Sequence, residues 1–196
     1  MAALTQSHVH GASSTPLIGE TVGALLRRTV EEGPGRAALI ARHQGIRWTY
    51  ADLLRRAEDL AIGLQALGLE KGDRVGIWSA NNSEWVQAQF GTALAGLILV
   101  NINSAYRAHE FEYALRKSGC RALILSPGHK SNDYFASLRS IAPEIDSAAP
   151  GRLSSMRLPK LEIVIRLGAD KAPGMLNFSE VAQPAISGAM ERNEAK

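Results

Sequence analysis

One stretch of this chain decides its fold: Gly72-Asp73-Arg74-Val75-Gly76-Ile77-Trp78-Ser79-Ala80-Asn81-Asn82-Ser83-Glu84-Trp85. It reads as a short apolar strand, a polar loop with helix-capping residues, and the start of a helix. The same order recurs downstream, with an aliphatic strand at residues 97–100, a helix around Phe111, and a strand at residues 121–125. Strands that alternate with helices predict an α/β fold with a mostly parallel sheet and helices on both faces. Because residues 97–100 are all aliphatic, we expect both faces of that strand to be covered.

The segments before this stretch predict a helix, a hairpin and a second helix. Residues 21–32 have helical periodicity and stop before Gly33. Residues 37–41 and 45–48 indicate two short strands joined by a polar turn. The next helix opens with the capping-box spacing of Thr49 and Asp52 and ends at Gly68. It has one apolar stripe, formed by Leu53, Ala57, Leu60, Leu64 and Leu67.

The remaining segments complete the expected organisation. The helix after Asn82 is expected to bury an apolar set, namely Val86, Phe90, Ala93 and Leu94. Beyond Pro127 we expect a helix at residues 133–141, an irregular segment at residues 142–160 and a strand at residues 161–167. Three regions follow: a flexible arm at residues 1–16, one domain at residues 17–182 and a weakly structured tail at residues 183–196.

Composition favours an ordinary globular protein of a reducing compartment. The 22 basic and 19 acidic residues give a net charge of +3, and opposite charges are interleaved, which argues against a nucleic-acid-binding stripe. Cys120 is the single cysteine, which excludes an intrachain disulfide and predicts a small buried side chain. The longest apolar run, residues 91–100, is about half of what a spanning helix requires. With no visible secretory signal or Arg-rich transit peptide, we expect a cytoplasmic protein without a membrane span.

The sequence lacks the short motifs typical of hydrolases, dinucleotide-binding proteins, P-loop proteins and zinc sites. It contains no Gly-x-Ser-x-Gly elbow, no Gly-x-Gly-x-x-Gly turn and no P-loop. The histidines lack zinc-like spacing with cysteines or acids: His8, His10, His43, His109 and His129. We expect the three tryptophans to pack in the core or at its rim: Trp48, Trp78 and Trp85.

Two basic residues are the candidate binding residues. Arg107 and Lys130 each follow the carboxyl end of a predicted parallel strand, where open α/β sheets bind their ligands. A cation at that edge is suited to a phosphate, while a solvated loop charge is the alternative interpretation.

Several motifs in order resemble the AMP-forming acyl-CoA synthetases, a family of adenylate-forming enzymes. They are Trp48-Thr49-Tyr50-Ala51-Asp52-Leu53, Gly68-Leu69-Glu70-Lys71-Gly72-Asp73-Arg74-Val75 and the segment from Ala95-Gly96 to Asn103. Asn101-Ile102-Asn103, Tyr106-Arg107 and Pro173-Gly174-Met175-Leu176-Asn177-Phe178 resemble the medium-chain fatty-acyl-CoA synthetases most. Ser104 stands where the family would have a proline. The resemblance runs from Pro16 to Phe178.

The resemblance implies an incomplete amino-terminal part of the adenylate-forming synthetase fold. Enzymes of this family use ATP and Mg²⁺ to convert a carboxylate to an acyl-adenylate, and coenzyme A then displaces AMP. The family's phosphate loop, rich in Thr, Ser and Gly and ending in lysine, has no counterpart here, so no catalytic or metal-binding residue is assigned. By the same resemblance, Arg107 and Lys130 are candidates for binding the phosphates of coenzyme A.

Three functions remain open at this point. The chain is the amino-terminal fragment of a fatty-acid:CoA ligase that is inactive alone, a short non-catalytic module, or a folded remnant. The module would bind coenzyme A, an acyl chain or a full-length partner. Either residues 97–100 or residues 161–167 are expected to present an open sheet edge or bare face, through which the chain would self-associate.

Overall fold

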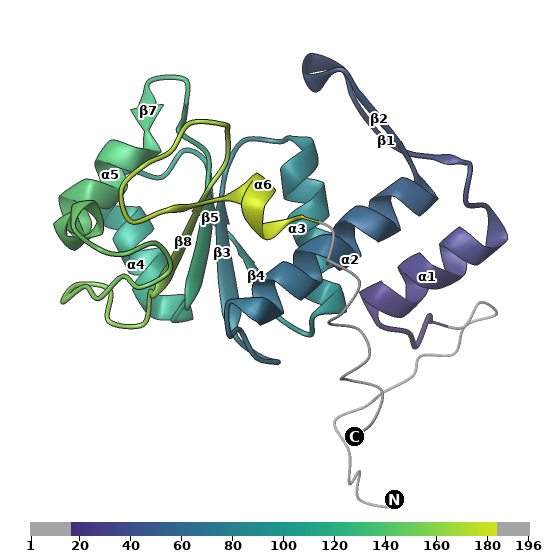
Figure 1. Cartoon of the computed structure of the whole chain (residues 1–196), viewed down its shortest axis with the longest axis horizontal. Coiled ribbons are helices and arrows are strands. Elements are labelled where there is room, and N and C mark those ends of the chain that lie inside the picture. Colours follow the sequence, from purple (N-terminus) through teal and green to yellow (C-terminus); the bar gives the residue numbers. More distant parts are fainter. Residues whose placement is uncertain (1–16, 184–196) are drawn as a thin grey trace, which may run out of the picture.

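The structure is a computed structural model that describes residues 17–183 (Figure 1). The predicted arm at residues 1–16 lies outside the described residues, as does the predicted tail apart from its first residue. The assignment of residues 17–182 to one domain stays a prediction.

A parallel sheet of five strands lies at the centre of the described residues. Its order is β4-β3-β5-β8-β9, and every neighbouring pair runs parallel. The strands are β3 (Arg74–Trp78), β4 (Ile98–Asn101), β5 (Ala122–Leu125), β8 (Ile163–Arg166) and β9 (Leu176–Asn177). The predicted strands at residues 74–78, 97–100, 121–125 and 161–167 therefore share one sheet, and the α/β prediction is confirmed. The short strand β9 was not predicted.

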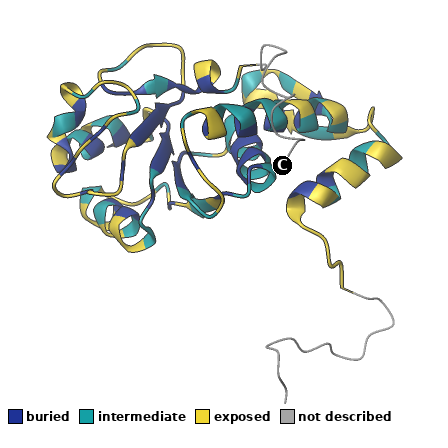
Figure 2. Cartoon of the chain, turned by 60° about the horizontal axis from the view of Figure 1, so that its bottom comes forward, coloured by how far each residue is buried: buried dark blue, intermediate teal, exposed yellow. Residues whose placement is uncertain are grey.

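Helices cover both faces of this sheet, as the sequence pattern predicted (Figure 1). On one face, α4 (Ala108–Ser118) and α5 (Tyr134–Ile141) pack against Trp78, Leu123 and Val164. On the other, α2 (Tyr50–Ala66) and α3 (Ser83–Leu94) pack against a second set of strand residues, including Val75, Ile77, Ile124 and Ile165. Side chains alternate between the faces along each strand. Each face thus has its own apolar core, and the buried residues concentrate in and around the strands (Figure 2).

The predicted face of α3 was wrong. The residues this helix buries most are Ser83, Gln87, Ala88, Gly91 and Thr92, whereas Val86, Phe90, Ala93 and Leu94 are half-buried. The reason is that α3 packs closely on α2: a Cβ on Gly91 would lie 3.0 Å from Leu60 Cδ2. Small residues occupy this close contact, and the larger Val86 and Phe90 pack beside it against a separate cluster around Trp48.

The predicted burial of residues 97–100 was also wrong. Strand β4 lies at the edge of the sheet within the described residues, and Ile98 is 51% exposed. Only Leu97, just before the strand, is buried. The strand within residues 161–167, the other candidate for an open edge, is β8, which is buried and lies between β5 and β9. Self-association through the edge at β4 stays a prediction.

The first part of the described chain forms a helix and a projecting hairpin (Figure 1). Helix α1 (Val22–Glu32) begins after Thr21, whose hydroxyl accepts a hydrogen bond from the Ala24 N–H. The hairpin consists of β1 (Ala37–Ala41), a 3₁₀ turn η1 (Arg42–Gln44) and β2 (Ile46–Thr49). Thr49 and Asp52 form the predicted capping box at the start of α2. These predictions are confirmed to within one or two residues.

The region after β5 is less regular. A two-residue-strand hairpin, β6 (Gly128–His129) and β7 (Asn132–Asp133), precedes α5 and was not predicted. Between α5 and β8 the chain contains one 3₁₀ turn, η2 (Pro143–Asp146), and is otherwise without helix or strand, as expected for residues 142–160. The short helix α6 (Phe178–Val181) follows β9.

Candidate functional site

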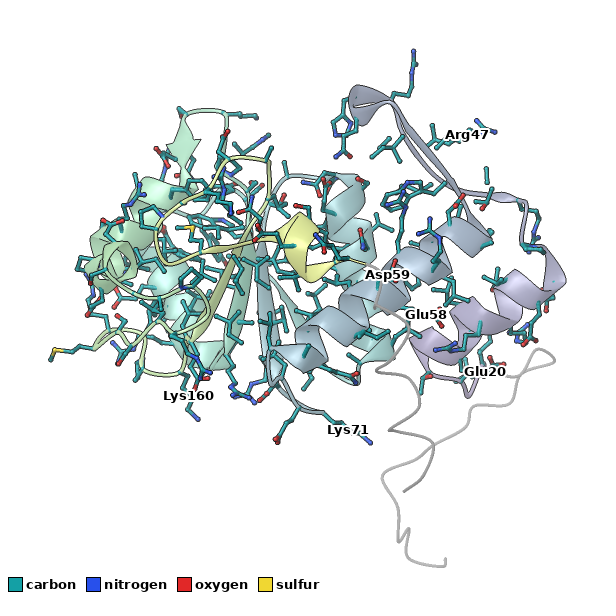
Figure 3. The ribbon with its side chains drawn as sticks, in the orientation of Figure 1. Glu20, Arg47, Glu58, Asp59, Lys71 and Lys160 are labelled. Carbon is teal, nitrogen blue, oxygen red and sulfur yellow. The ribbon has the colours of Figure 1, made fainter. Side chains whose placement is uncertain are left out.

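A small polar pocket lies beside the carboxyl ends of β4 and β5. Lys71 and Lys160, which precede strands, mark the opposite, amino-terminal edge of the sheet in Figure 3. The pocket encloses about 220 Å³ between the loop after β4 and the β6–β7 hairpin after β5. Its lining residues are Ser104, Ala105, Arg107, His129, Lys130, Ser131 and Asn132. The structure therefore brings both sequence-predicted candidates, Arg107 and Lys130, to one site.

Buried aromatic side chains position the loop that carries Arg107. Trp78 is stacked between Phe111 and Tyr134, with ring centroids 3.9 Å apart in both pairs. The Trp78 indole Nε1 donates to the Asn103 carbonyl at 2.9 Å, and the Tyr134 hydroxyl donates to the Ser104 carbonyl at 2.8 Å. Burial raises the pKa of the Tyr134 phenol although its hydrogen bond to Ser104 opposes the rise, so the hydroxyl stays a donor at neutral pH. This part of the loop is thus fixed by the core.

The backbone conformation of the hairpin presents Lys130. Lys130 has φ +53°, and among the described residues no other non-glycine residue has a positive φ. It is the first of the two residues that join β6 to β7, where hairpin turns of the primed types require this conformation. At Gly128 the two strands approach so closely that a Cβ would lie 2.4 Å from the Asn132 carbonyl oxygen. A lysine held in a left-handed conformation is mildly strained, as functional residues often are.

Asn132 connects the two segments of the pocket. Its amide Nδ2 donates to the Tyr106 carbonyl at 2.7 Å, and its Oδ1 accepts a hydrogen bond from Arg107 Nη1 at 3.3 Å. Asn132 is buried, whereas Arg107 and Lys130 are exposed and His129 is half-buried. The charged groups of Arg107 and Lys130 are therefore accessible to a ligand, whereas Asn132, which binds Arg107, is not.

The charges of the pocket favour an anion. None of its lining residues is acidic, and the nearest carboxylates in sequence serve as helix caps. Glu110 accepts a hydrogen bond from the Arg107 N–H at 3.1 Å, and Asp133 accepts one from the Ala136 N–H at 2.9 Å. The arginine guanidinium, the lysine ammonium and the serine hydroxyl are all groups that donate hydrogen bonds to phosphate in proteins. The donor set thus fits a phosphate group.

Other residues considered from the sequence lie elsewhere. Cys120 is buried and its thiol pKa is raised by burial, which makes it a structural side chain as predicted. Trp48 and Trp78 are buried in the core and Trp85 is half-buried at its rim, also as predicted. Within residues 17–183, no three His, Cys, Asp or Glu side chains gather into a group that could hold a metal ion. His8 and His10 lie outside the described residues.

Comparison with known proteins identifies the family. The sequence profile described as "AMP-binding enzyme" matches residues 26–192. The chain belongs to this family. It is 43% identical over 187 residues to the protein named "Medium-chain acyl-CoA ligase ACSF2, mitochondrial" from Bos taurus. That alignment covers 95% of this chain but 30% of the cattle protein. The chain therefore spans less than a third of the length of the curated relatives it matches.

Solved structures of the family share the fold. The crystal structure of the anthranilate CoA ligase AuaEII in complex with anthranoyl-AMP has a TM-score of 0.70 and 25% identity, over 84% of this chain and 28% of that one. The inhibitor-bound N-terminal domain of FACL13 from Mycobacterium tuberculosis has a TM-score of 0.62 and 27% identity, over 83% of this chain and 35% of that one. The predicted resemblance to adenylate-forming acyl-CoA synthetases is thereby confirmed, with this chain matching their amino-terminal part.

The helices of the described region are too short or too polar to cross a bilayer. None of those found in residues 17–183 reaches the length and hydropathy that a membrane span needs.

Proposed function

We propose that this chain is the amino-terminal part of an ATP-dependent fatty-acid:CoA ligase. The support is the match to the AMP-binding enzyme family and the similarity to a protein named as a medium-chain acyl-CoA ligase. The complete protein would join a medium-chain fatty acid to coenzyme A with cleavage of ATP to AMP and pyrophosphate. Within that protein, Arg107 and Lys130 would bind the phosphate-bearing nucleotide end of coenzyme A.

The reaction class explains what a ligase must supply. A free carboxylate is a poor electrophile, and its conversion to an acyl-adenylate provides AMP as a leaving group for the thiol of coenzyme A. Charge on the phosphates during adenylation requires donors and Mg²⁺. We assign no residue of this chain to that step. The contribution we propose here is binding: holding the nucleotide end of coenzyme A fixes the position of its thiol for attack.

One observation carries the coenzyme A assignment: two cations from separate chain segments meet in a pocket that no acidic side chain lines. Arg107 lies at the start of α4, and Lys130 lies at the tip of the β6–β7 hairpin. His129 and the hydroxyls of Ser104 and Ser131 would complete the phosphate contacts.

The experiment uses a chimera in which this chain replaces the matching segment of the cattle ligase. Arg107→Ala and Lys130→Ala would each raise the KM for coenzyme A about tenfold, as the loss of one hydrogen bond to a charged group does. The rate of fatty-acid-dependent ATP–pyrophosphate exchange, which needs no coenzyme A, would stay unchanged. Arg47→Ala, at an exposed arginine on β2, is the matched control. An unchanged KM in both site variants would reduce Arg107 and Lys130 to loop charges.

We also propose that the protein acts in the cytoplasm. The single, buried Cys120 suits a reducing compartment, although the cattle relative is named as mitochondrial. Fluorescence imaging of the complete, tagged protein beside a mitochondrial marker decides between the two. Overlap with the marker would place it in the mitochondrion instead.

A further inference from the structure

Asn132 makes three hydrogen bonds whose chemistry fixes the direction of its side chain. Its Nδ2 lies 2.7 Å from the Tyr106 carbonyl oxygen and 3.5 Å from the Ser104 carbonyl oxygen. Carbonyl oxygens only accept hydrogen bonds, so the amide NH₂ must face them. The Oδ1 atom therefore faces Arg107 Nη1, which only donates, at 3.3 Å. With both ends of the amide matched, the alternative rotation by half a turn is excluded.

We propose that Asn132 is a positioning residue for the anion site: it orders Arg107 toward the pocket without neutralising its charge. The proposal rests on the proposed function, since the pocket's ligand there is coenzyme A. Asn132 is 8% exposed and does not need to touch the ligand. It belongs to β7, in the same hairpin as Lys130, and it binds the loop that ends at Arg107. A single side chain thus brings the two cations to one site.

The neutral amide is the important property of this residue. An aspartate at position 132 would have the same shape and would attract Arg107 more strongly. It would, however, add a negative charge beside the cation that a phosphate must use, and would turn a carboxylate oxygen toward the carbonyls of Ser104 and Tyr106. An amide that donates to carbonyls and accepts from a guanidinium holds the arginine while leaving its full charge to the ligand.

The loop does not depend on Asn132 alone. Trp78 Nε1 and the Tyr134 hydroxyl hold the Asn103 and Ser104 carbonyls independently. We therefore expect the fold to survive a substitution at position 132. The effect should be concentrated on the Tyr106 carbonyl and on the Arg107 guanidinium, which have no aromatic partner of this kind.

A test on the 196-residue chain separates orientation from binding. Orientation is measured as the rate at which phenylglyoxal modifies Arg107, followed by mass spectrometry, with Arg47 as internal reference. Binding is measured by NMR titration with coenzyme A. Asn132→Ala should speed Arg107 labelling several-fold and weaken binding about tenfold. Asn132→Asp should keep Arg107 protected and still weaken binding at least as much. On an Arg107→Ala background, Asn132→Ala should cause no further loss.

A matched control is available at Asn177. This asparagine is 5% exposed and its Nδ2 donates to the carbonyls of Gly168, Ala169 and Asp170, away from the pocket. Asn177→Ala should melt at a temperature similar to that of Asn132→Ala, but it should alter neither Arg107 labelling nor coenzyme A binding. If both alanine variants weaken binding equally, the effect is structural and the inference is overturned.

The outcomes distinguish this inference from the proposed function. Unchanged Arg107 labelling in Asn132→Ala, or full affinity in Asn132→Asp, overturns the positioning role while coenzyme A still binds. Absence of coenzyme A binding by the unaltered chain removes the role of Asn132 in binding, whereas the proposed function concerns the complete protein and is tested by the KM of the chimera for coenzyme A. The labelling rates would even then decide whether Asn132 restrains Arg107.

Discussion

The backbone conformation of Lys130 makes a prediction that links stability to function. Lys130 has φ +53°, in the left-handed region, where a residue with a Cβ is less stable than glycine by roughly 1–2 kcal/mol. Glycine also raises the entropy of the unfolded chain, which costs about 0.4–1 kcal/mol. The difference predicts that Lys130→Gly raises the free energy of unfolding by about 0.5–1 kcal/mol. Lys130→Ala, which keeps the Cβ, should leave it nearly unchanged.

Thermal unfolding of the 196-residue chain measures this difference. For a chain of this size, the glycine variant should melt about 2–4 °C above the alanine variant per kcal/mol gained. Both variants should bind coenzyme A about tenfold more weakly, because both lose the ammonium group. Residues that bind ligands are often less stable than the best alternative at their position. A lysine where glycine would be more stable fits such a role.

The neighbouring residue supplies the matched control. Ser131 is the second residue of the same loop, and its φ is not positive. Ser131→Gly should therefore be less stable than Ser131→Ala, by about 0.5–1 kcal/mol, the reverse of the order at Lys130. If the alanine variant at Lys130 is at least as stable as the glycine variant, Lys130 is not held in the left-handed conformation.

Three further predictions follow from other parts of the chain. Gly91→Val should lower the free energy of unfolding by about 1–3 kcal/mol, measured by urea titration. The reason is that a Cβ at this position would lie 3.0 Å from Leu60 Cδ2 and 3.1 Å from the Ala57 carbonyl oxygen. An unchanged urea midpoint would contradict the close packing of α2 and α3. Burial raises the pKa of Asp73, but hydrogen bonds from the Glu70 N–H and Arg121 outweigh it and the pKa lies below its ordinary value. A lowered carboxyl pKa stabilises the fold above the unfolded-state pKa, and this stability is lost as the pH falls through about 4 and below. Arg121→Met should reduce the loss of stability at acidic pH, measured as the urea midpoint at a series of pH values. An unchanged loss would show that the hydrogen bond between Arg121 and Asp73 does not cause it. Finally, the 196-residue chain should catalyse no Mg²⁺-dependent ATP–pyrophosphate exchange with any fatty acid, since its sequence encodes no Thr/Ser/Gly-rich loop ending in lysine; exchange above a buffer blank would show otherwise.

Local patterns in the sequence were enough to predict most of the elements. The capping box of Thr49 and Asp52 marks the start of α2, and the apolar run from Val75 to Trp78 marks β3. These features depend on residues close together in the chain. The alternation of strands and helices then restricts the topology to a parallel sheet with crossovers.

Burial could not be predicted where it depends on distant neighbours. An aliphatic run such as residues 97–100 fits an interior or an edge strand equally well, and the position of β4 in the sheet order is a tertiary property. Likewise α3 packs on α2 on one side and on the sheet on another, so no single apolar stripe identifies its buried face.

The positions of two residues of the candidate site, Arg107 and Lys130, could be predicted from the topology of parallel sheets. The carboxyl ends of parallel strands meet at one edge of a sheet, and this placed Arg107 and Lys130 near each other. The residue that joins their segments, Asn132, has a short polar side chain in a loop without periodicity, so no sequence pattern singled it out. The β6–β7 hairpin was missed for the same reason, although Gly128 and the following polar residues are typical of turns.

Two thiol substrates of different size test whether Arg107 and Lys130 bind the phosphates of coenzyme A. In the chimera with the cattle ligase, kcat/KM is measured for coenzyme A and for pantetheine, which carries the same thiol but lacks the nucleotide. The Arg107→Ala/Lys130→Ala double variant should lose roughly a hundredfold in kcat/KM with coenzyme A, about tenfold per contact, and nothing with pantetheine. Equal losses with both thiols would contradict it.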